Sequence, residues 1–343
     1  MNDAGTVHPL LNEWRERALQ AETEVRKAVV GQDRAIRLIT IALFARGHAL
    51  LEGDVGVGKT TLLRAITRTL GGSYERVEGT VDLMPNDLLY YTYVDENGKP
   101  RVDPGPLLRH GEGLSTFFFN EINRARPQVH ALLLRAMAER SVSAFNREYR
   151  FPHLQVFADR NRVEREETFE IPSAARDRFM FELAIEAPKD RDLRQALAFD
   201  PMFHDTDALI ERVALGVLPY ENLNEVGRLI QDSVVASTAI RDYAMTVWEA
   251  THRPADFGVA LPGVDMQALV LAGASPRGIA MLLKAARVVA WLDQRSYLVP
   301  EDLHAVFHEA MAHRIFFTPV YEMRRASLAR DLTRAILDRV AAP

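Results

Sequence analysis

The sequence contains no cysteine and only five lysines among its 343 residues. Without cysteine the chain forms no disulfide bond and no thiolate metal site. No uncharged apolar run approaches about 18 residues, so we expect no membrane-spanning helix. The first 30 residues lack the apolar segment of a signal peptide. These absences lead us to expect a cytoplasmic protein.

An excess of positive charge is also missing. The chain has 42 Lys and Arg against 47 Asp and Glu, which gives a formal net charge of −5. Proteins that hold nucleic acid through bulk charge carry a basic balance, so a nucleic-acid partner is not expected. Apolar residues make up 48% of the chain, the usual share for a globular protein. The length fits one large and one smaller domain.

The pattern of apolar residues changes near residue 187. Before it, short apolar strands alternate with helical stretches, which predicts βαβ units and a mainly parallel sheet. Behind it, helical spacing dominates, for example over residues 265–272, 276–294, 300–314 and 320–340. We predict an N-terminal helix within residues 1–30, an α/β domain over 31–187 and an all-α domain over 188–343.

A phosphate-binding loop is predicted by Gly53-Asp-Val-Gly-Val-Gly58-Lys59-Thr60, which fits G-x-x-x-x-G-K-[ST] between a strand and a helix. The glycines let backbone N–H groups turn toward the phosphates of ATP, and the helix dipole favours the anion. Lys59 would reach the β- and γ-phosphates, and the Thr60 hydroxyl would ligate Mg²⁺. The residues assigned to ATP binding here are Asp54, Val55, Gly56, Val57, Gly58, Lys59, Thr60 and Thr61.

An apolar strand ends in Asn120 and Glu121. In such ATPases the first of these positions holds an acid on the magnesium side, and the second holds an acid that activates water. Glu121 suits the second role. Asn120 can accept a hydrogen bond from a Mg²⁺-bound water through its carbonyl, but it brings no charge to the metal. The alternative is that both residues merely start a loop.

A second strand ends at Asn161, which could position the attacking water, although Asn is common after strands. Strand alternation places Asp159 on the same side as Asn161. Asp159 is therefore a candidate to supply the carboxylate that Asn120 lacks. The alternative is that Asp159 pairs with Arg160 or Arg162.

Two arginines complete the set of candidates. Arg178 precedes the last apolar strand and could project to a neighbouring subunit, or it could pair locally with Asp177. Arg277 lies in the first turn of a helix that Ser275 is expected to cap, with Pro276 at the first helical position. From there it could face a phosphate across a domain cleft, or it could be an ordinary surface arginine.

Taken in order over residues 25–320, these positions resemble the MoxR family of AAA+ ATPases. The most specific pieces are Val30-Gly31-Gln32, Gly47-His-Ala-Leu-Leu-Glu-Gly53, Glu121-Ile-Asn-Arg-Ala125, Ala174-Ala-Arg-Asp-Arg-Phe179 and Gly273-Ala-Ser-Pro-Arg277. Residues 78–106 resemble the helix-2 insertion of this clade, with a hairpin turn at Asn97-Gly98. Residues 141–152 resemble its second hairpin.

The resemblance implies a P-loop ATPase core followed by a helical lid. It implies that Gly31 and Gln32 lie against the adenine, that Asn161 is the first sensor and Arg277 the second, and that Arg178 completes a neighbour's site. It further implies a ring, with a hexamer expected. Members are similar to chaperones that activate metalloenzymes, often with a von Willebrand A domain partner, and the namesake role concerns active methanol dehydrogenase.

Three departures from the family pattern are visible. Asn120 replaces the usual Asp, Asp159-Arg-Asn-Arg162 replaces the usual Thr-Gln-Asn-Pro, and residues 164–170 are unusually charged. The first departure puts the rate of hydrolysis in question. We therefore consider three functions: an ATP-hydrolysing chaperone, a nucleotide switch that barely hydrolyses ATP, and a nucleic-acid motor of the same clade, which the acidic balance disfavours.

Overall fold

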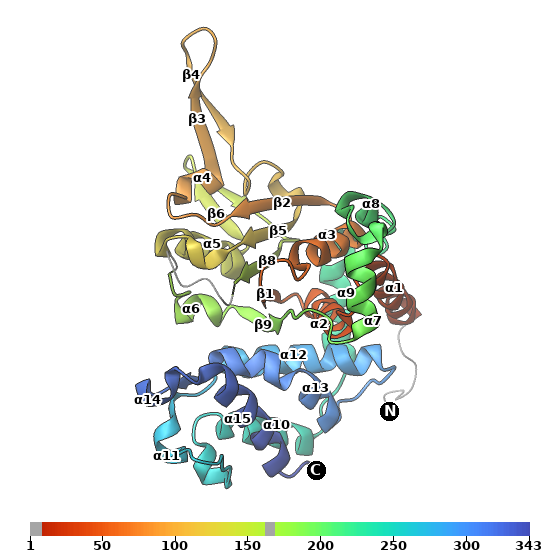
Figure 1. Cartoon of the computed structure of the whole chain (residues 1–343), viewed down its shortest axis with the longest axis vertical. Coiled ribbons are helices and arrows are strands. Elements are labelled where there is room, and N and C mark those ends of the chain that lie inside the picture. The colour runs from red at the N-terminus through yellow and green to blue at the C-terminus, as the bar shows by residue number, and fades with distance from the viewer. Residues whose placement is uncertain (1–8, 162–168) are drawn as a thin grey trace.

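A five-stranded parallel sheet forms the centre of the first half of the chain (Figure 1). The computed structural model describes residues 9–161 and 169–343. The strand order is β2-β5-β8-β1-β9, and every neighbouring pair is parallel, which confirms the predicted parallel sheet. The strands are β1 (His48–Glu52), β2 (Ser73–Glu78), β5 (Leu114–Asn120), β8 (Gln155–Arg160) and β9 (Phe179–Ala184).

The apolar run in β5 reflects burial on both faces of the sheet. Phe118 joins a core with residues of the helices α1 (Pro9–Arg26), α2 (Asp33–Phe44) and α3 (Lys59–Leu70). Phe117 and Phe119 point to the opposite face, where they join a second core with α5 (Pro127–Glu139). A parallel sheet covered on both sides has near-continuous apolar strands, because no face is left for polar residues.

Two hairpins lie outside this sheet, and both were expected from the sequence. The first pairs β3 (Tyr90–Val94) with β4 (Pro100–Pro104), follows the short helix α4 (Pro85–Leu89), and projects from the body (Figure 1). The second pairs β6 (Ser141–Ala144) with β7 (Arg147–Arg150). The turn of the second hairpin meets the base of the first, since the ring of Phe145 lies 4.8 Å from that of Tyr90.

Helices dominate the chain behind β9, as predicted. The short helix α6 (Ser173–Arg176) precedes β9. The later helices are α7 (Arg191–Phe199), α8 (Thr206–Glu211), α9 (Leu223–Ser233), α10 (Thr238–Ala250), α11 (Met266–Leu269), α12 (Pro276–Leu292), α13 (Pro300–Met311), α14 (Pro319–Glu322) and α15 (Arg325–Arg339).

The prediction of one helix in this region, over residues 265–272, is wrong in part. Residues 265–272 form only the four-residue α11, and the chain then extends as β10 (Val270–Ala272). β10 pairs with β11 (Phe316–Phe317), a partner about 45 residues further along the chain. Helical spacing in a short segment carries no information about such a distant partner, and here the pairing overrides it.

The helices just behind residue 187 lie against the α/β part, whereas α10 to α15 form the lower body in Figure 1. Arg64 of α3 forms an ion pair with Asp207 of α8, and Arg68 donates to the carbonyl of Val213. The domain boundary near residue 187 therefore stays a prediction.

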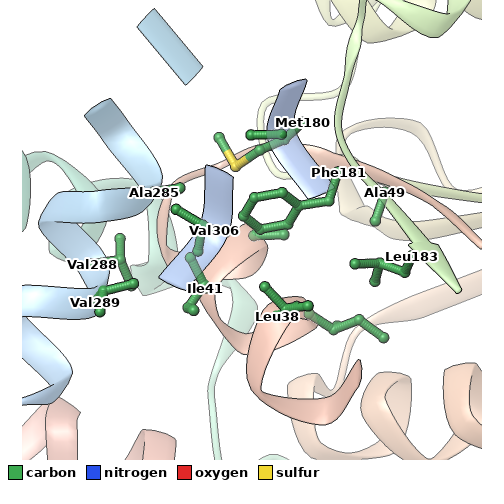
Figure 2. Packing of buried hydrophobic residues seen from close by; sticks show 14 of the residues in the cluster. Leu38, Ile41, Ala49, Met180, Phe181, Leu183, Ala285, Val288, Val289 and Val306 are labelled. Carbon is green, nitrogen blue, oxygen red and sulfur yellow. The ribbon is translucent and has the colours of Figure 1, made fainter. Parts of the chain in front are cut away.

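The helices α10 to α15, called the lid below, are joined to the sheet by apolar contacts (Figure 2). Leu38 and Ile41 of α2 are in one cluster with Phe181 of β9 and with Val288 and Val306 of the lid. All of these side chains are part of one continuous core. Lid and α/β part therefore share a core, and the burial of its apolar area stabilises their packing against each other.

No helix in residues 9–161 or 169–343 is both long enough and apolar enough to cross a membrane.

Candidate active site

The loop between β1 and α3 has the backbone that phosphate binding requires. Gly56 (φ 79°) and Gly58 (φ 87°) are both left-handed, and open space surrounds the position of a Cβ on either residue. α3 begins at Lys59, so its first N–H groups face the loop. Glycines that permit positive φ next to a helix N-terminus form an anion-binding cradle, and the loop therefore fits a nucleotide phosphate.

Lys59 is held inside this cradle by neutral oxygens. Its Nζ donates to the carbonyl of Gly53 at 2.7 Å and to Oδ1 of Asn161 at 2.7 Å, and the residue is only 8% exposed. The Asp159 carboxylate lies 3.5 Å from the same Nζ. The same Nζ also donates to the carbonyl of Asp54 at 3.2 Å. A buried ammonium with three neutral acceptors and one carboxylate is well placed to exchange partners when an anion enters the loop.

Glu121 is connected to Lys59 through Asn161. Asn161 accepts from Lys59 through Oδ1 and donates through Nδ2 to Oε1 of Glu121 at 3.1 Å. The other Glu121 oxygen lies 3.0 Å from Arg124. Glu121 has a left-handed backbone (φ 52°, ψ 49°) at the point where β5 ends. The predicted water-activating acid and the predicted first sensor are therefore in direct contact.

Asp159 lies on the same side of β8 as Asn161, as strand alternation predicts. Its Oδ1 accepts the backbone N–H of Glu121 at 2.6 Å, and the residue is 2% exposed. Burial raises the pKa of this carboxyl, although the Glu121 N–H and Lys59 oppose that shift. The alternative pairing with Arg160 does not form, because Arg160 contacts Glu52 and Glu182. Arg162 lies outside the described residues, and a magnesium role for Asp159 stays a prediction.

Asn120 is buried at the end of β5, and its partner was not identified from the sequence. Its Nδ2 donates to Oε1 of Glu78, the last residue of the neighbouring strand β2. Glu78 and Asn120 are aligned in the register of the sheet. The polar sequence of β2 gave no apolar run from which an edge strand could be predicted, so this contact was missed.

The two candidate arginines, Arg178 and Arg277, are far apart in the sequence but lie close together in the structure, because Arg277 contacts Asp177. Arg178 donates to the carbonyl of Ala174 at 2.7 Å. The alternative local partner, Asp177, forms ion pairs with Arg277 and Arg314. Arg277 contacts Asp177 at 2.5 Å, and Ser275 donates to the same carboxylate. Ser275 also caps α12, as predicted, by accepting from Gly278 N–H.

Gly31 and Gln32 lie at the edge of a cavity of about 990 Å³ between the α/β part and the lid. Gly31 is left-handed (φ 72°), and a Cβ there would lie 2.8 Å from Pro188. Gln32 donates to the carbonyl of Glu186 at 2.6 Å. The cavity could admit a flat base, and the assignment of these two residues to adenine stays a prediction.

The residues around the loop also fit Mg²⁺. In the described parts of the chain no three His, Asp or Glu side chains form a cage for a metal ion. Mg²⁺ prefers to keep several waters and is usually held by one or two protein groups together with phosphates, so such a cage is not needed. Thr60, in the first turn of α3, and Asn120 are the candidates to hold it.

Comparisons with known proteins agree with this geometry. The model of the ATPase family associated with various cellular activities (AAA) matches residues 48–181, and that of the AAA lid domain matches residues 266–336. Protein MoxR of Methylorubrum extorquens is 64% identical over 343 residues, which is all of both chains. Protein MoxR of Paracoccus denitrificans is 55% identical, over 97% of this chain and 98% of that protein.

A more distant relative and a solved structure extend the likeness. Chaperone MoxR1 of Mycobacterium tuberculosis is 30% identical, over 99% of this chain and 84% of that protein. A crystal structure described as a candidate ATPase from Cytophaga hutchinsonii superposes with a TM-score of 0.83. It is 26% identical and covers 97% of both chains.

Proposed function

Because the chain belongs to the MoxR family of AAA+ ATPases, we propose that it is a Mg²⁺-dependent, ATP-hydrolysing motor that activates a protein client. The family makes it a chaperone-like ATPase. The finer proposal is that the client is a metalloenzyme such as methanol dehydrogenase, reached directly or through a von Willebrand A domain partner. The names of the relatives support a chaperone role, and the client is our inference from the resemblance.

The observation that carries the proposal is the connected series Lys59, Asn161 and Glu121. It joins a cation beside the phosphate loop to a carboxylate through one amide. When the γ-phosphate of ATP enters the loop, it competes with Asn161 and Gly53 for the Lys59 ammonium, because a charged acceptor binds an ammonium more strongly than a neutral one. Asn161 is then free to turn its amide toward the phosphate.

Glu121 would act on the attacking water. Its carboxylate loses one partner when Asn161 turns, and it can then accept a hydrogen bond from water beside the γ-phosphate. Its main-chain N–H stays fixed by Asp159, which holds the strand end in place during the change. Mg²⁺, when bound with ATP beside Thr60 and Asn120, would neutralise charge on the β- and γ-phosphates.

Assembly and client binding use other surfaces. Arg178 would complete the site of a neighbouring subunit in a ring, for which we propose a hexamer, and Arg277 would contribute to the same reaction. The hairpin β3–β4 projects from the body (Figure 1). It exposes Tyr91 and Tyr93, at 43% and 47% respectively. Exposed aromatic rings on a projecting hairpin are suited to holding a protein segment, since aromatic residues are enriched where proteins bind each other.

The test compares two variants with matched controls. Lys59→Ala should abolish tight ATP binding, because the main cation facing the β- and γ-phosphates is lost. Glu121→Gln should keep ATP binding and lower the steady-state hydrolysis rate by about 100-fold or more. Binding is measured with a fluorescent ATP analogue and hydrolysis by phosphate release. Lys99→Ala and Glu139→Gln, both on exposed side chains, are the controls and should behave as wild type.

Two results would contradict the proposal. One is an ATP affinity of Lys59→Ala within about threefold of wild type, since the loop would then not be the binding site. The other is an unchanged turnover of Glu121→Gln.

A nucleotide switch is the second candidate, and the uncharged Asn120 is the observation that favours it. Such a protein would bind ATP, assemble and dock its partner, but would hydrolyse ATP very slowly. Single-turnover hydrolysis with and without Mg²⁺ separates the two functions. A motor cleaves the bound ATP within its cycle when Mg²⁺ is added, whereas a switch retains intact ATP.

A further inference from the structure

Glu78 ends the edge strand β2 beside Asn120, which stands where the family pattern that this sequence resembles has an acid. The two residues are aligned across β2 and β5, and Asn120 Nδ2 donates to Glu78 Oε1. We infer that Glu78 is a positioning residue for the magnesium side of the site, supplying from the neighbouring strand the carboxylate that Asn120 lacks. The inference rests on the proposed Mg²⁺-dependent ATPase function and adds a role for Glu78 to it.

The chemistry of the pair fixes the orientation of the amide. An ionised carboxylate only accepts hydrogen bonds, so Asn120 must turn its Nδ2 toward Glu78. Its Oδ1 is then left as the acceptor for a metal-bound water. Without Glu78 nothing in this pair would favour that orientation over the reverse, which would direct an N–H group at the metal. Glu78 therefore fixes Asn120 and adds one negative charge near the cation.

The charge of Glu78 is available for this role. Its only ion pair among the described residues is with Arg76 at 2.9 Å, and the two side chains are 48% and 41% exposed. Exposed pairs of this kind are weak because water screens them. Arg76 also lies over the ring of Phe118, 5.7 Å from its centre, so part of its packing is independent of Glu78.

Asp159 is the other carboxylate that could supply the negative charge that Asn120 lacks. Its contacts differ from those of Glu78. Its carboxylate accepts the Glu121 N–H and faces Lys59, so it already balances one cation and holds one backbone group. The contact of Glu78 is to the Asn120 side chain itself. Of the two acids, Glu78 is the one in a position to control the residue at the magnesium side.

The experiment uses the wild type, Glu78→Gln, Asn120→Asp and the double variant of the full-length chain. The readout is the Mg²⁺ concentration that half-saturates binding of a fluorescent, non-hydrolysable ATP analogue. Glu78→Gln should raise it by about fivefold, because the charge and the fixed orientation are both lost. Asn120→Asp should also be impaired, because two carboxylates then face each other across the strands. The double variant restores one carboxylate and one amide, and should return to within about twofold of wild type.

The control for a merely structural role is Arg76→Gln, which breaks the exposed ion pair and leaves the Glu78 carboxylate in place. We expect its Mg²⁺ dependence within about twofold of wild type. Binding of the analogue in EDTA should be the same in all five proteins, since none of the changes touches the phosphate loop. Thermal melting checks that each variant is folded.

Several outcomes would overturn the inference. Additive effects of Glu78→Gln and Asn120→Asp would show that the two residues act separately, and a gain of Mg²⁺ affinity in Asn120→Asp alone would show that Glu78 does not supply the charge. An Arg76→Gln protein that behaves as Glu78→Gln would indicate a structural ion pair. If Asn120→Asp does not fold, an unchanged Glu78→Gln is sufficient to reject the inference. Wild-type binding with no Mg²⁺ dependence would instead count against the proposed function itself.

Discussion

Glu121 combines two features at the scale of a single residue. Its backbone is left-handed, which costs an L-residue about 1–2 kcal/mol. The 2.6 Å hydrogen bond from its N–H to the buried Asp159 carboxylate offsets part of that cost. The conformation directs the Glu121 side chain toward Asn161 instead of along the strand. The strained backbone of Glu121 is therefore held in place by Asp159 of the neighbouring strand β8.

Glu182 allows a test, also at the scale of one residue, of how a buried charge contributes to folding stability. Burial alone would raise the pKa of this carboxyl, but Arg160 and Arg176 outweigh burial and lower its pKa from 4.5 to about 2. A lowered pKa means that the stabilisation is present above about pH 4.5 and is lost as the pH falls toward 2. The shift corresponds to on the order of 3 kcal/mol of folding free energy.

We therefore expect Glu182→Gln to be less stable than wild type at neutral pH and to show a flatter loss of stability on acidification. Urea unfolding between about pH 3 and pH 7 measures both effects. Glu139→Gln, which removes one partner of an exposed pair on α5, is the control. If the free energy of unfolding falls as steeply with decreasing pH in Glu182→Gln as in wild type, Glu182 is not the group responsible for the loss of stability in acid.

At the scale of elements, the segment that resembles a helix-2 insertion, residues 78–106, begins directly against the end of β5. Gly79 follows Glu78, and its N–H donates to the carbonyl of Asn120 at 2.7 Å. A Cβ on Gly79 would lie 2.2 Å from the carbonyl oxygen of Glu121. No side chain fits between these two backbones, so the insertion and the turn at Glu121 are held at a fixed distance.

Gly79→Ala should separate the two segments. We expect it to destabilise the fold by about 1–3 kcal/mol, as overpacking does. ATP hydrolysis should fall by about tenfold or more because Glu121 is displaced, since small errors of position cost large factors in rate. ATP affinity should change much less. Gly113→Ala is the matched control, because open space surrounds that Cβ. Normal hydrolysis by Gly79→Ala would show that the contact has no part in the reaction.

The sequence alone pointed to Lys59, Glu121 and Asn161, which the structure brings together in the candidate site, and it did so for a physical reason. Phosphate binding requires glycines and a lysine at fixed spacing in one segment, so the loop through Lys59 is visible in the chain itself. Glu121 and Asn161 end apolar strands, and the carboxyl ends of parallel strands meet at one edge of the sheet. The contact of Lys59 with Asn161 follows once the strand order β5-β8-β1 is known.

The parts that could not be predicted depend on partners far apart in the sequence. β2 is an edge strand with few apolar residues, so neither the strand nor the pairing of Glu78 with Asn120 has a local signal. The pairing of Arg277 with Asp177 likewise depends on how the lid is placed. The extended segment β10 was taken for helix because its partner, β11, lies in another part of the chain.

At the scale of the whole molecule, the lid and the α/β part share one apolar core, and the candidate intersubunit residue Arg178 lies at their junction. If Arg178 acts on a neighbouring subunit, an isolated subunit has an incomplete site. ATP should then promote assembly of a ring. An intersubunit role of Arg178 also predicts that two variants, each inactive alone, regain activity when they are mixed.

Arg178→Ala and Lys59→Ala should each be inactive alone and should regain hydrolysis when mixed. The first variant contributes an intact phosphate loop and the second an intact arginine. In a random equal mixture roughly one interface in four combines both, so about a quarter of the wild-type rate is the upper expectation. Assembly is checked by size-exclusion chromatography. No recovery, with both variants still assembled, would indicate that Arg178 acts within its own subunit.

Arg314, which lies just behind α13 in the lid, binds the start of β9, the strand that follows Arg178. Its buried guanidinium donates to the carboxylate and carbonyl of Asp177 and to the carbonyls of Phe179 and Met180. Asp177 also binds Arg277 of α12. The backbone on both sides of Arg178 is therefore hydrogen-bonded to the lid, so we expect a rotation of the lid to displace Arg178 as well. If Arg178 completes the site of the next subunit, a movement of the lid in one subunit would be transmitted through Arg178 to the site of its neighbour.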